Sequence, residues 1–208
     1  MIRVLLADDH AILRAGLKEI LAETGDIAVA GEATNGQEVL SLIRGNDFDL
    51  AVLDMSMPGL SGIELIKRLK LEKPRLRLLV LSMHAEQQYA LRALKAGAAG
   101  YLTKDSASAQ LAGVIRKIAA GGVHISETAA AQLVGAATGA NALPHARLSN
   151  REFEVFRLLV AGDGPTEIAE RLHLSVKTVS THKTRILEKM AMESTADLVR
   201  YAIENKLT

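Results

Sequence analysis

Acidic side chains follow two apolar runs that have the composition of buried strands. Residues 50–54 read Leu-Ala-Val-Leu-Asp and lead into a Pro-Gly turn, which predicts a strand buried on both faces and ending at Asp54. The run 2–7 ends in the same way at Asp8 and Asp9. Ligands bind at the carboxyl edge of parallel sheets, so three carboxylates are expected to meet at one candidate site.

Carboxylates gathered at one edge repel each other unless a cation lies among them. Mg²⁺ prefers oxygen ligands and keeps several waters, so two carboxylates and one backbone carbonyl would hold it. A phosphoryl donor on such an ion could be attacked in line by a neighbouring carboxylate. Asp54 is the best candidate nucleophile, because its strand is expected to be central, and the product would be an aspartyl phosphate. Taken alone, an Asp after a strand is more often a turn former or helix cap.

Two further strand ends carry groups that suit phosphoryl chemistry. Lys104 follows the run 100–103 and could place an ammonium against a phosphoryl oxygen. Ser82 ends the run 78–82 and could donate a hydroxyl hydrogen bond. Each residue taken singly is an ordinary surface or turn residue, and it is their joint placement that favours a site.

The composition is that of a globular chain, because 49% of the residues are hydrophobic and 24% are charged. A length of 208 residues is comfortable for two domains. The absence of cysteine excludes disulfides, a thiolate metal site and a cysteine nucleophile. No apolar run approaches the ~20 residues that span a bilayer, and the strand pattern starts at once without a signal peptide, so the cytoplasm is the expected compartment.

Apolar strand-like runs alternate with helical patterns over residues 1–122. This alternation predicts an α/β fold, a doubly wound, flavodoxin-like five-stranded parallel sheet with helices on both faces. The expected strands are 2–7, 27–33, 50–54, 78–82 and 100–103, and the expected helices lie near 11–23, 36–44, 62–71, 86–96 and 107–120.

Residues 148–208 show only helix signals and predict a small all-α domain of four helices. The expected helix starts are a capping box at Ser149 and Glu152, Gly164 before Pro165, Ser175, and Ser194 before Asp197. A helix of two turns, a short turn and a longer helix from Val176 to about Met190 make a helix-turn-helix pattern. Residues 123–147 are expected to link the two domains, with a possible short helix over 126–137 and a flexible linker over 138–146.

The motifs of residues 1–120 resemble the receiver domain of two-component response regulators in both order and spacing. The resemblance implies Mg²⁺ as the cofactor, held by Asp8, Asp9, Asp54 and the backbone carbonyl of Ser56, with Asp54 as the phosphoacceptor. It implies that Ser82 is the switch hydroxyl, Tyr101 the switch aromatic residue and Lys104 the phosphoryl-binding lysine.

Two points in this resemblance stay open in the sequence. Many receivers have Pro after the lysine, whereas this chain has Asp105, which leaves the geometry of that peptide bond open. The family switch would move the hydroxyl toward the phosphoryl group and the aromatic ring into the vacated space. For Tyr101 the alternative is a half-exposed strand residue without such a role.

The third helix of the C-terminal domain concentrates positive charge. Residues 175–190 hold four basic residues against Glu188 alone, although the net charge of the chain is only +1. On a helical wheel the apolar face is Val176, Val179, Ile186, Leu187 and Met190, and the other face is Lys177, Thr181, Thr184, Arg185 and Glu188, with Ser180 at its flank. A solvated polar face would explain this pattern, but hydroxyl groups beside basic ones also contact bases and phosphates in a major groove.

Residues 148–205 resemble the LuxR-type helix-turn-helix output domain of the NarL/FixJ subgroup, which is shared with quorum-sensing activators. The matching words are 148–152, 167–172, 174–179 and His182, and Gly164 stands where a hydroxyl cap is usual. The resemblance implies base contacts by Ser180, Thr181 and Thr184 and phosphate contacts by Lys177, Lys183 and Arg185, of which Lys183 projects toward the apolar side. It also implies a dimerisation helix with Leu198, Val199, Ala202 and Ile203.

Together these features predict a DNA-binding transcription regulator activated by phosphorylation, and not an enzyme apart from its own phosphoryl transfer and dephosphorylation. A sensor histidine kinase would be the donor to Asp54, and a homodimer would bind paired DNA half-sites. One alternative is a Mg²⁺-dependent phosphatase with an aspartate nucleophile, which usually has a second acid where Ser56 stands. The other is a regulator whose receiver is never phosphorylated. The histidines show no metal-binding spacing, and His10 and His84 are interpreted as loop or cap residues.

Overall fold

The computed structural model describes residues 1–83, 87–125, 143–172, 174–205 and 207. They belong to two compact units, which divide in the sequence between Leu133 and Val134. The short helix expected over 126–137, most of the expected linker and His84 lie outside the described residues.

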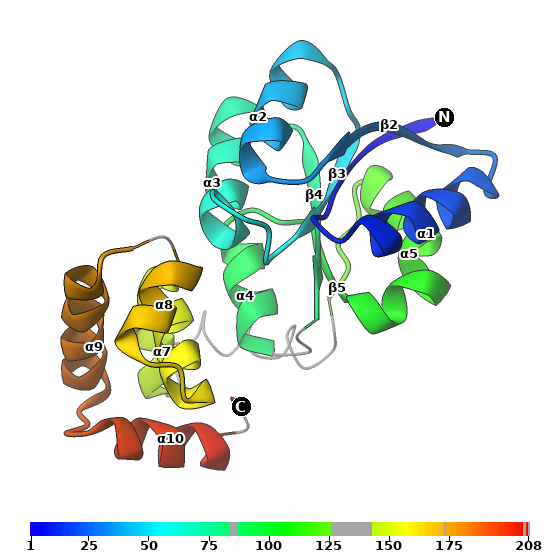
Figure 1. Cartoon of the computed structure of the whole chain (residues 1–208). Coiled ribbons are helices and arrows are strands. Elements are labelled where there is room, and N and C mark those ends of the chain that lie inside the picture. Colours follow the sequence, from blue (N-terminus) through cyan, green and yellow to red (C-terminus); the bar gives the residue numbers. More distant parts are fainter. Residues whose placement is uncertain (84–86, 126–142, 173, 206, 208) are drawn as a thin grey trace. The chain divides into compact units, whose positions relative to one another are not determined.

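The first unit is built around a parallel sheet with strand order β2-β1-β3-β4-β5 (Figure 1). The strands are β1 (Ile2–Ala7), β2 (Ile27–Ala33), β3 (Leu50–Asp54), β4 (Arg77–Ser82) and β5 (Gly100–Thr103). All five residues of the central strand β3 are buried, as expected for an apolar run covered on both faces. The order in which the chain adds strands to the sheet reverses between β1 and β3. At such a point a crevice opens at the carboxyl ends of the strands.

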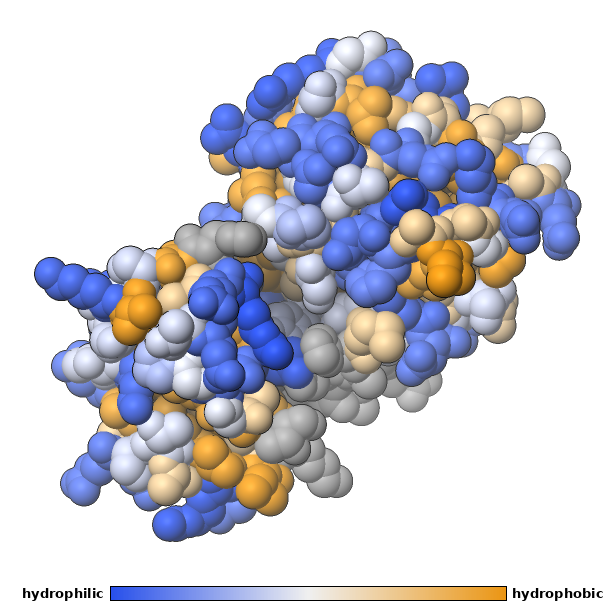
Figure 2. Space-filling model, viewed as in Figure 1, coloured by the Kyte–Doolittle hydropathy of each residue, from blue (hydrophilic) through white to orange (hydrophobic). Residues whose placement is uncertain are grey.

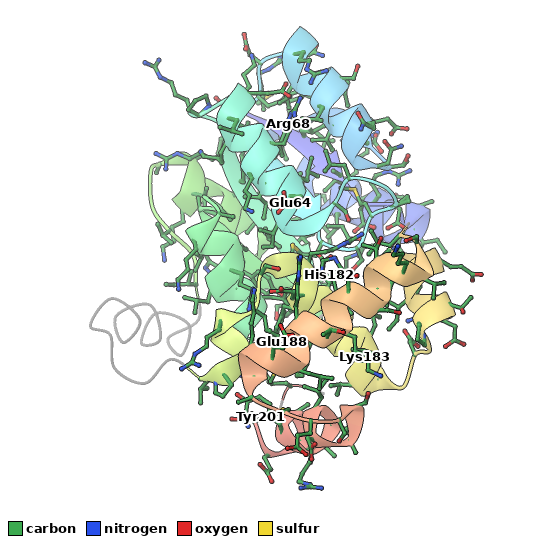
Figure 3. All side chains as sticks on the ribbon, turned by 90° about the vertical axis from the view of Figure 1, so that its left-hand side faces the viewer. Glu64, Arg68, His182, Lys183, Glu188 and Tyr201 are labelled. Carbon is green, nitrogen blue, oxygen red and sulfur yellow. The ribbon has the colours of Figure 1, made fainter. Side chains whose placement is uncertain are left out.

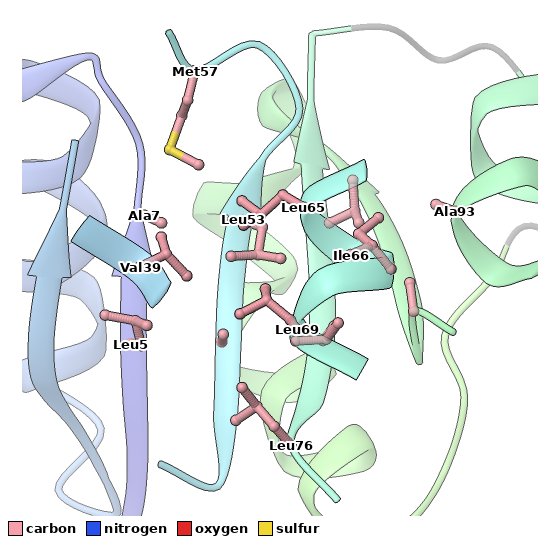
Figure 4. Close-up of a cluster of buried hydrophobic side chains, with 14 of the residues drawn as sticks. Leu5, Ala7, Val39, Leu53, Met57, Leu65, Ile66, Leu69, Leu76 and Ala93 are labelled. Atoms are coloured by element: carbon pink, nitrogen blue, oxygen red, sulfur yellow. The ribbon is translucent and has the colours of Figure 1, made fainter. Parts of the chain in front are cut away.

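Helices cover both faces of the sheet (Figure 1). On one face lie α2 (Gly36–Gly45), α3 (Gly62–Glu72) and α4 (Gln87–Lys95), and on the other lie α1 (Ala11–Ala22) and α5 (Lys104–Ala119). Successive strand residues point to opposite faces, so Leu53 belongs to the first core (Figure 4) and Val52 to the second. The predicted doubly wound sheet is confirmed.

The start of α5 differs from the prediction, which placed it at 107. The helix begins at Lys104, with Thr103 at its N-cap and Asp105 in its first turn. A carboxylate in the first turn is favoured by the helix dipole, which is why a polar stretch that resembles a loop is helical here. The Lys104–Asp105 peptide bond is trans, as are all peptide bonds of the described residues.

The second unit consists of short helices with capped ends. A 3₁₀ turn η1 (Pro144–Arg147) precedes α7 (Asn150–Ala161), α8 (Pro165–Arg171), α9 (Val176–Met190) and α10 (Thr195–Glu204). Capping boxes begin α7 at Ser149 and α10 at Ser194, and at the glycine cap of α8 the Glu167 carboxylate accepts a hydrogen bond from the Gly164 amide at 2.6 Å. The four predicted helices are present.

The core of this unit includes a residue from the expected linker. His145 of η1 is 1% exposed, and its Nδ1 lies 2.6 Å from the Tyr201 hydroxyl of α10. Its ring also lies near Phe153 of α7, with ring centroids 6.3 Å apart. The prediction of a flexible linker was therefore wrong for its last residues, because a buried histidine with an aromatic hydroxyl partner holds them in the helical unit.

Hydrophilic residues dominate the surface in the view of Figure 2, and the apolar residues on it form small, separate patches. No helix of the described residues combines the length and the apolar character that crossing a membrane requires.

Candidate functional site

Asp54 lies at the carboxyl end of the central strand, where the crevice is expected. It is 2% exposed, and its Oδ1 accepts a hydrogen bond from the Ser56 amide at 3.2 Å. Burial, together with the nearby charge of Asp8, raises the pKa of the Asp54 carboxyl above its usual value, although Lys104 acts in the opposite direction.

Lys104 joins two buried carboxylates. Its Nζ lies 2.8 Å from Asp8 Oδ2 and 2.9 Å from Asp54 Oδ2, and the three side chains are at most 4% exposed. Burial alone would lower the pKa of Lys104, but its contacts with Asp8 and Asp54 outweigh burial and raise the pKa above its usual value. The ammonium is therefore held in its charged form between the two acids.

Asp9 and His10 complete the acidic edge. The His10 Nδ1 atom lies 3.1 Å from Asp9 Oδ1, 3.2 Å from Asp8 Oδ1 and 3.9 Å from Asp54 Oδ2. One ligand atom from each of these four residues falls within 4.8 Å of all the others. His10 does occupy the N-cap of α1, but without a capping hydrogen bond from its side chain, which lies among the carboxylates instead. The interpretation of His10 as only a cap residue therefore missed this contact.

The acidic edge fits a small, hard cation. The carboxylates of Asp8 and Asp54 are buried and share the single ammonium of Lys104, and Asp9 adds a third carboxylate to the same edge. Carboxylate oxygens gathered in this way are the ligands that Mg²⁺ prefers. The Ser56 amide donates its hydrogen bond to Asp54. The contact of the Ser56 carbonyl with a metal ion stays a prediction.

Ser82 and Tyr101 lie on the neighbouring strands β4 and β5. Ser82 is 1% exposed and pairs in register with Thr103, the residue before Lys104. Tyr101 is 8% exposed and belongs to the core that α2, α3 and α4 cover. The alternative of a half-exposed Tyr101 is therefore wrong, because the ring is packed inside the unit.

In the second unit, α9 presents a polar face to solvent. Lys177, Ser180, Thr181, Thr184 and Arg185 are exposed and Lys183 is half-buried, whereas Val179, Ile186 and Met190 are buried (Figure 3 labels Lys183). The three hydroxyl groups donate hydrogen bonds to the carbonyls four residues earlier, at 3.0 to 3.2 Å. Val176 was predicted on the apolar face but is 45% exposed, since it begins the helix beyond the edge of the core.

Comparison with known families gives two matches, one in each unit. Residues 4–116 match the family described as "Response regulator receiver domain", and residues 146–202 match "Bacterial regulatory proteins, luxR family". The chain belongs to the response regulators.

Similar proteins match this chain over nearly its whole length and nearly all of their own. The response regulator UvrY of Escherichia coli K12 is 34% identical over 100% of this chain and 96% of its own, and the oxygen regulatory protein NreC of Staphylococcus carnosus is 35% identical over 99% and 98%. Among solved structures, RcsB from Salmonella enterica serovar Typhimurium, bound to the promoter P1flhDC with the phosphomimetic BeF₃⁻, is 30% identical over 96% of this chain and 97% of its own, with a TM-score of 0.70.

The predicted function is thereby confirmed at the level of the family. This response regulator is a phosphorylation-activated regulator of transcription in a two-component system, with a receiver domain and a LuxR-type domain, rather than a classical enzyme.

Sequence reasoning missed one contact that positions α9 of this response regulator. Glu152, 3% exposed, closes the capping box of α7 and also contacts Lys189 of α9, with Nζ 2.7 and 2.9 Å from its two carboxylate oxygens. The capping box was visible as a motif, whereas no spacing signals a partner 37 residues away.

The predicted dimerisation residues do not all lie at the surface. Leu198 and Ala202 are 0% exposed, because α10 packs on α7 and buries them in the core of the helical unit. Val199 is half-buried, and Ile203 is 63% exposed. The part of the prediction that gave Leu198 and Ala202 to a dimer contact was wrong.

Proposed function

We propose that this response regulator accepts a phosphoryl group on Asp54 from a sensor histidine kinase and then binds DNA as a homodimer. The observation that carries the proposal is the buried arrangement of Asp8, Lys104 and Asp54, with the ammonium 2.8 and 2.9 Å from the two carboxylates. A carboxylate at the end of the central strand, beside a fixed cation, suits attack on an electrophilic phosphorus.

Each side chain has a separate part in the proposed transfer. Asp54 attacks the phosphorus through Oδ2, because its Oδ1 is engaged by the Ser56 amide, and the bond between phosphorus and the kinase histidine nitrogen breaks as the new bond forms. Lys104 contacts Oδ2 and would follow the new negative charge onto a phosphoryl oxygen. Ser82, buried on the next strand, would donate its hydroxyl to another phosphoryl oxygen, and the Tyr101 ring would fill the space that Ser82 leaves. The same groups would serve the protein's own dephosphorylation.

Asp8, Asp9, Asp54 and the backbone carbonyl of Ser56 would hold Mg²⁺. When bound, the ion supplies positive charge that lets phosphoryl oxygens approach the carboxylates. The carboxylate oxygens of Asp8, Asp9 and Asp54, which lie within 4.8 Å of one another, support this assignment.

We assign DNA binding to the exposed face of α9. Lys177, Lys183 and Arg185 would contact phosphates, and Ser180, Thr181 and Thr184 would contact base edges. Because the three hydroxyl protons are already donated within the helix, the oxygens are left as acceptors. Acceptors suit the amino groups of adenine and cytosine, and the Thr methyl groups suit the thymine methyl.

A second copy would contact α10 through Ile203 and Val199. A twofold dimer of this kind sets two α9 helices about 34 Å apart, so the DNA target would have two half-sites. We take residues 1–122 as the receiver, 123–147 as the connection and 148–208 as the DNA-binding domain, with the cytoplasm as the compartment.

The phosphoacceptor is tested by intact-mass measurement after incubation with a small-molecule acyl phosphate and Mg²⁺. The wild-type chain is expected to gain one phosphoryl group, and Asp54→Asn is expected to gain none, because an amide is not a nucleophile. Asp49→Asn, a change on the same strand region but at the opposite end of β3, is the matched control and should gain mass like the wild type. A gain by Asp54→Asn would place the phosphoryl group elsewhere.

The base preference is tested by selecting bound sequences from random DNA with wild type and with Thr181→Val. This change keeps the shape and the methyl group but removes the acceptor oxygen. We expect lost preference at positions with adenine or cytosine and retained preference for thymine. An unchanged selection profile would remove Thr181 from base recognition.

A further inference from the structure

The outer edge of β5 is paired with the beginning of the connection between the domains. His124 lies beside Gly100 in a parallel bridge, outside the five named strands. The His124 amide donates to the Ala99 carbonyl at 3.0 Å, and the Tyr101 amide donates to the His124 carbonyl at 3.0 Å. These two bonds have the pattern of a parallel strand pair, so His124 extends the sheet by one residue beyond β5.

Glycine residues allow the chain to reach this edge. A Cβ added at Gly100 would lie 3.2 Å from the His124 carbonyl oxygen and 2.6 Å from Cδ1 of Ile118 in α5. After α5 the chain turns at Gly121, whose φ of +94° lies in the left-handed region that favours glycine, and its amide donates to the Ile118 carbonyl at 2.9 Å. Helix α5 is thereby the crossover that brings His124 parallel to β5.

The bridge joins two backbones that have different neighbours. On one side is Tyr101, whose ring is 8% exposed and packs in the core under α2, α3 and α4. On the other side is the segment from which the chain continues to the DNA-binding domain. Hydrogen bonds weaken steeply when their geometry is lost, so a displacement of the β5 backbone at Tyr101 either moves His124 or breaks the pair.

The pairing depends on these hydrogen bonds more than on apolar burial. Val123, the residue before the bridge, is 48% exposed, and His124 is only half-buried. Segments with few buried apolar contacts belong to the least stable parts of a fold and change without global unfolding. The edge of β5 is therefore a place where a small change inside the receiver can alter the start of the connection.

We propose that the pairing of His124 with β5 couples the phosphorylation state of the receiver to the DNA-binding domain. The inference rests on the role of Tyr101 in the proposed function, to which it adds the route out of the receiver. The displacement of Tyr101 changes the two hydrogen bonds at His124, and the altered pairing repositions the chain that leads to the DNA-binding domain.

The experiment compares His124→Pro with His124→Ala in the full chain. Proline removes the amide that bonds to Ala99, whereas alanine removes the same imidazole and keeps the amide. Intact mass after incubation with a small-molecule acyl phosphate and Mg²⁺ measures phosphoryl uptake by each chain. DNA affinity is measured before and after this incubation, on a sequence that the wild type selects from random DNA.

We expect the wild type and both variants to gain one phosphoryl group. Phosphorylation should raise DNA affinity by the same factor in wild type and His124→Ala, on the order of tenfold, and by a factor close to one in His124→Pro. Equal factors in His124→Pro and His124→Ala would overturn the inference and leave the proposed function intact. If the wild type gains no phosphoryl group, the proposed function fails and the inference fails with it.

A measurement on the wild type alone serves if His124→Pro does not fold. Exchange of the Tyr101 amide hydrogen with solvent is followed by NMR with and without BeF₃⁻ and Mg²⁺, a stable mimic of the phosphoryl group. Because the acceptor of this amide is the His124 carbonyl, its exchange rate relative to that of Val4 in β1 should differ on the order of tenfold between the two conditions. Equal relative rates would contradict the coupling.

Discussion

The ammonium of Lys104 offsets the repulsion between two buried carboxylates. Its ammonium lies within 2.9 Å of both Asp8 and Asp54, and none of the three side chains has appreciable access to water. Removing one partner of a buried ion pair leaves the other partner's charge buried, where neither water nor protein compensates it. The stability of the receiver and its chemistry therefore depend on the same contact.

We predict that Lys104→Met, measured in chelator by denaturant unfolding, lowers the free energy of unfolding by about 3 kcal/mol. The matched comparison is the double variant with Asp54→Asn, which removes one of the two stranded charges. It should recover a large part of the loss, as a double-mutant cycle would detect. Equal losses in the single and double variants would contradict the ion-pair account.

A second carboxylate has a shifted pKa for a different reason. Asp26 precedes β2 and makes two hydrogen bonds of 2.7 Å with the guanidinium of Arg116 on α5. This contact lowers the pKa of Asp26 from 3.8 to about 2. A folded-state pKa below the ordinary value means that the contact stabilises the fold above pH 3.8 and is lost as the pH falls through about 2.

Arg116→Gln is expected to raise the pKa of Asp26 from about 2 toward 3.8, as followed by carboxyl carbon NMR during an acid titration. Arg75→Gln, which removes a cation that is not among the causes of this shift, should leave that titration unchanged. A low pKa that persisted without Arg116 would show that Thr24 or the backbone holds the carboxylate.

Both the residue types at the strand ends and their meeting at one edge were readable in the sequence, whereas the contact that His10 makes there was not. Asp8, Asp54 and Lys104 were expected at one edge because parallel strands end together, and the structure brings them into contact. The contact of His10 with the acids was not predicted, because a residue next to an acidic pair has no sequence signal that separates it from a loop residue. Only the fold turns its ring toward the third acid, Asp54.

At the scale of elements, the loop that follows Asp54 is packed against the first turn of α2. A Cβ added at Gly36 would lie 1.8 Å from the backbone oxygen of Leu60, which cannot rotate away. Only glycine therefore lets α2 approach this loop. Gly16, within α1, has nothing within 4 Å of an added Cβ.

Gly36→Ala is expected to destabilise the receiver by about 1–3 kcal/mol, as overpacking does. Gly16→Ala, the same chemical change in open space, should instead stabilise it by about 0.5–1 kcal/mol through reduced backbone freedom. Denaturant midpoints of both variants give the comparison, and two changes of the same sign would refute the packing argument.

Strand and helix periodicity located these elements well, because buried parallel strands are apolar throughout and helices carry caps. The boundaries were less accessible, as the early start of α5 at Lys104 shows. The burial of Leu198 and Ala202 was also not readable, because an apolar stripe on a last helix does not reveal whether it faces its own core or a second copy.

At the scale of the whole molecule, two lysines of α9 should differ in what they contribute. Lys177 is exposed, whereas Lys189 contacts the buried Glu152. The first is available for a phosphate, and the second fixes the helix in its unit.

Lys177→Ala is expected to leave stability unchanged and to reduce the slope of log affinity against log salt by about 2 for a dimer on DNA. Lys189→Ala should lower the free energy of unfolding by about 1–3 kcal/mol, because Glu152 loses its cation, and should keep the salt slope. DNA affinity is measured over a series of salt concentrations on promoter DNA, and thermal unfolding is measured on the same variants. Together the two measurements distinguish the role of Lys177 from that of Lys189. If Lys189→Ala reduced the salt slope and Lys177→Ala lowered the free energy of unfolding, α9 would contact DNA through its other end.

The buried contact between His145 and Tyr201 determines where the chain can be divided. A fragment excised at Leu148 would lose His145, expose one face of Phe153 and leave the Tyr201 hydroxyl without its partner. A chimera that grafts this output module onto a foreign receiver should therefore keep residues from Leu143 onward. The fusion boundary for such a chimera should lie before η1 rather than at α7, the first α-helix of the helical unit.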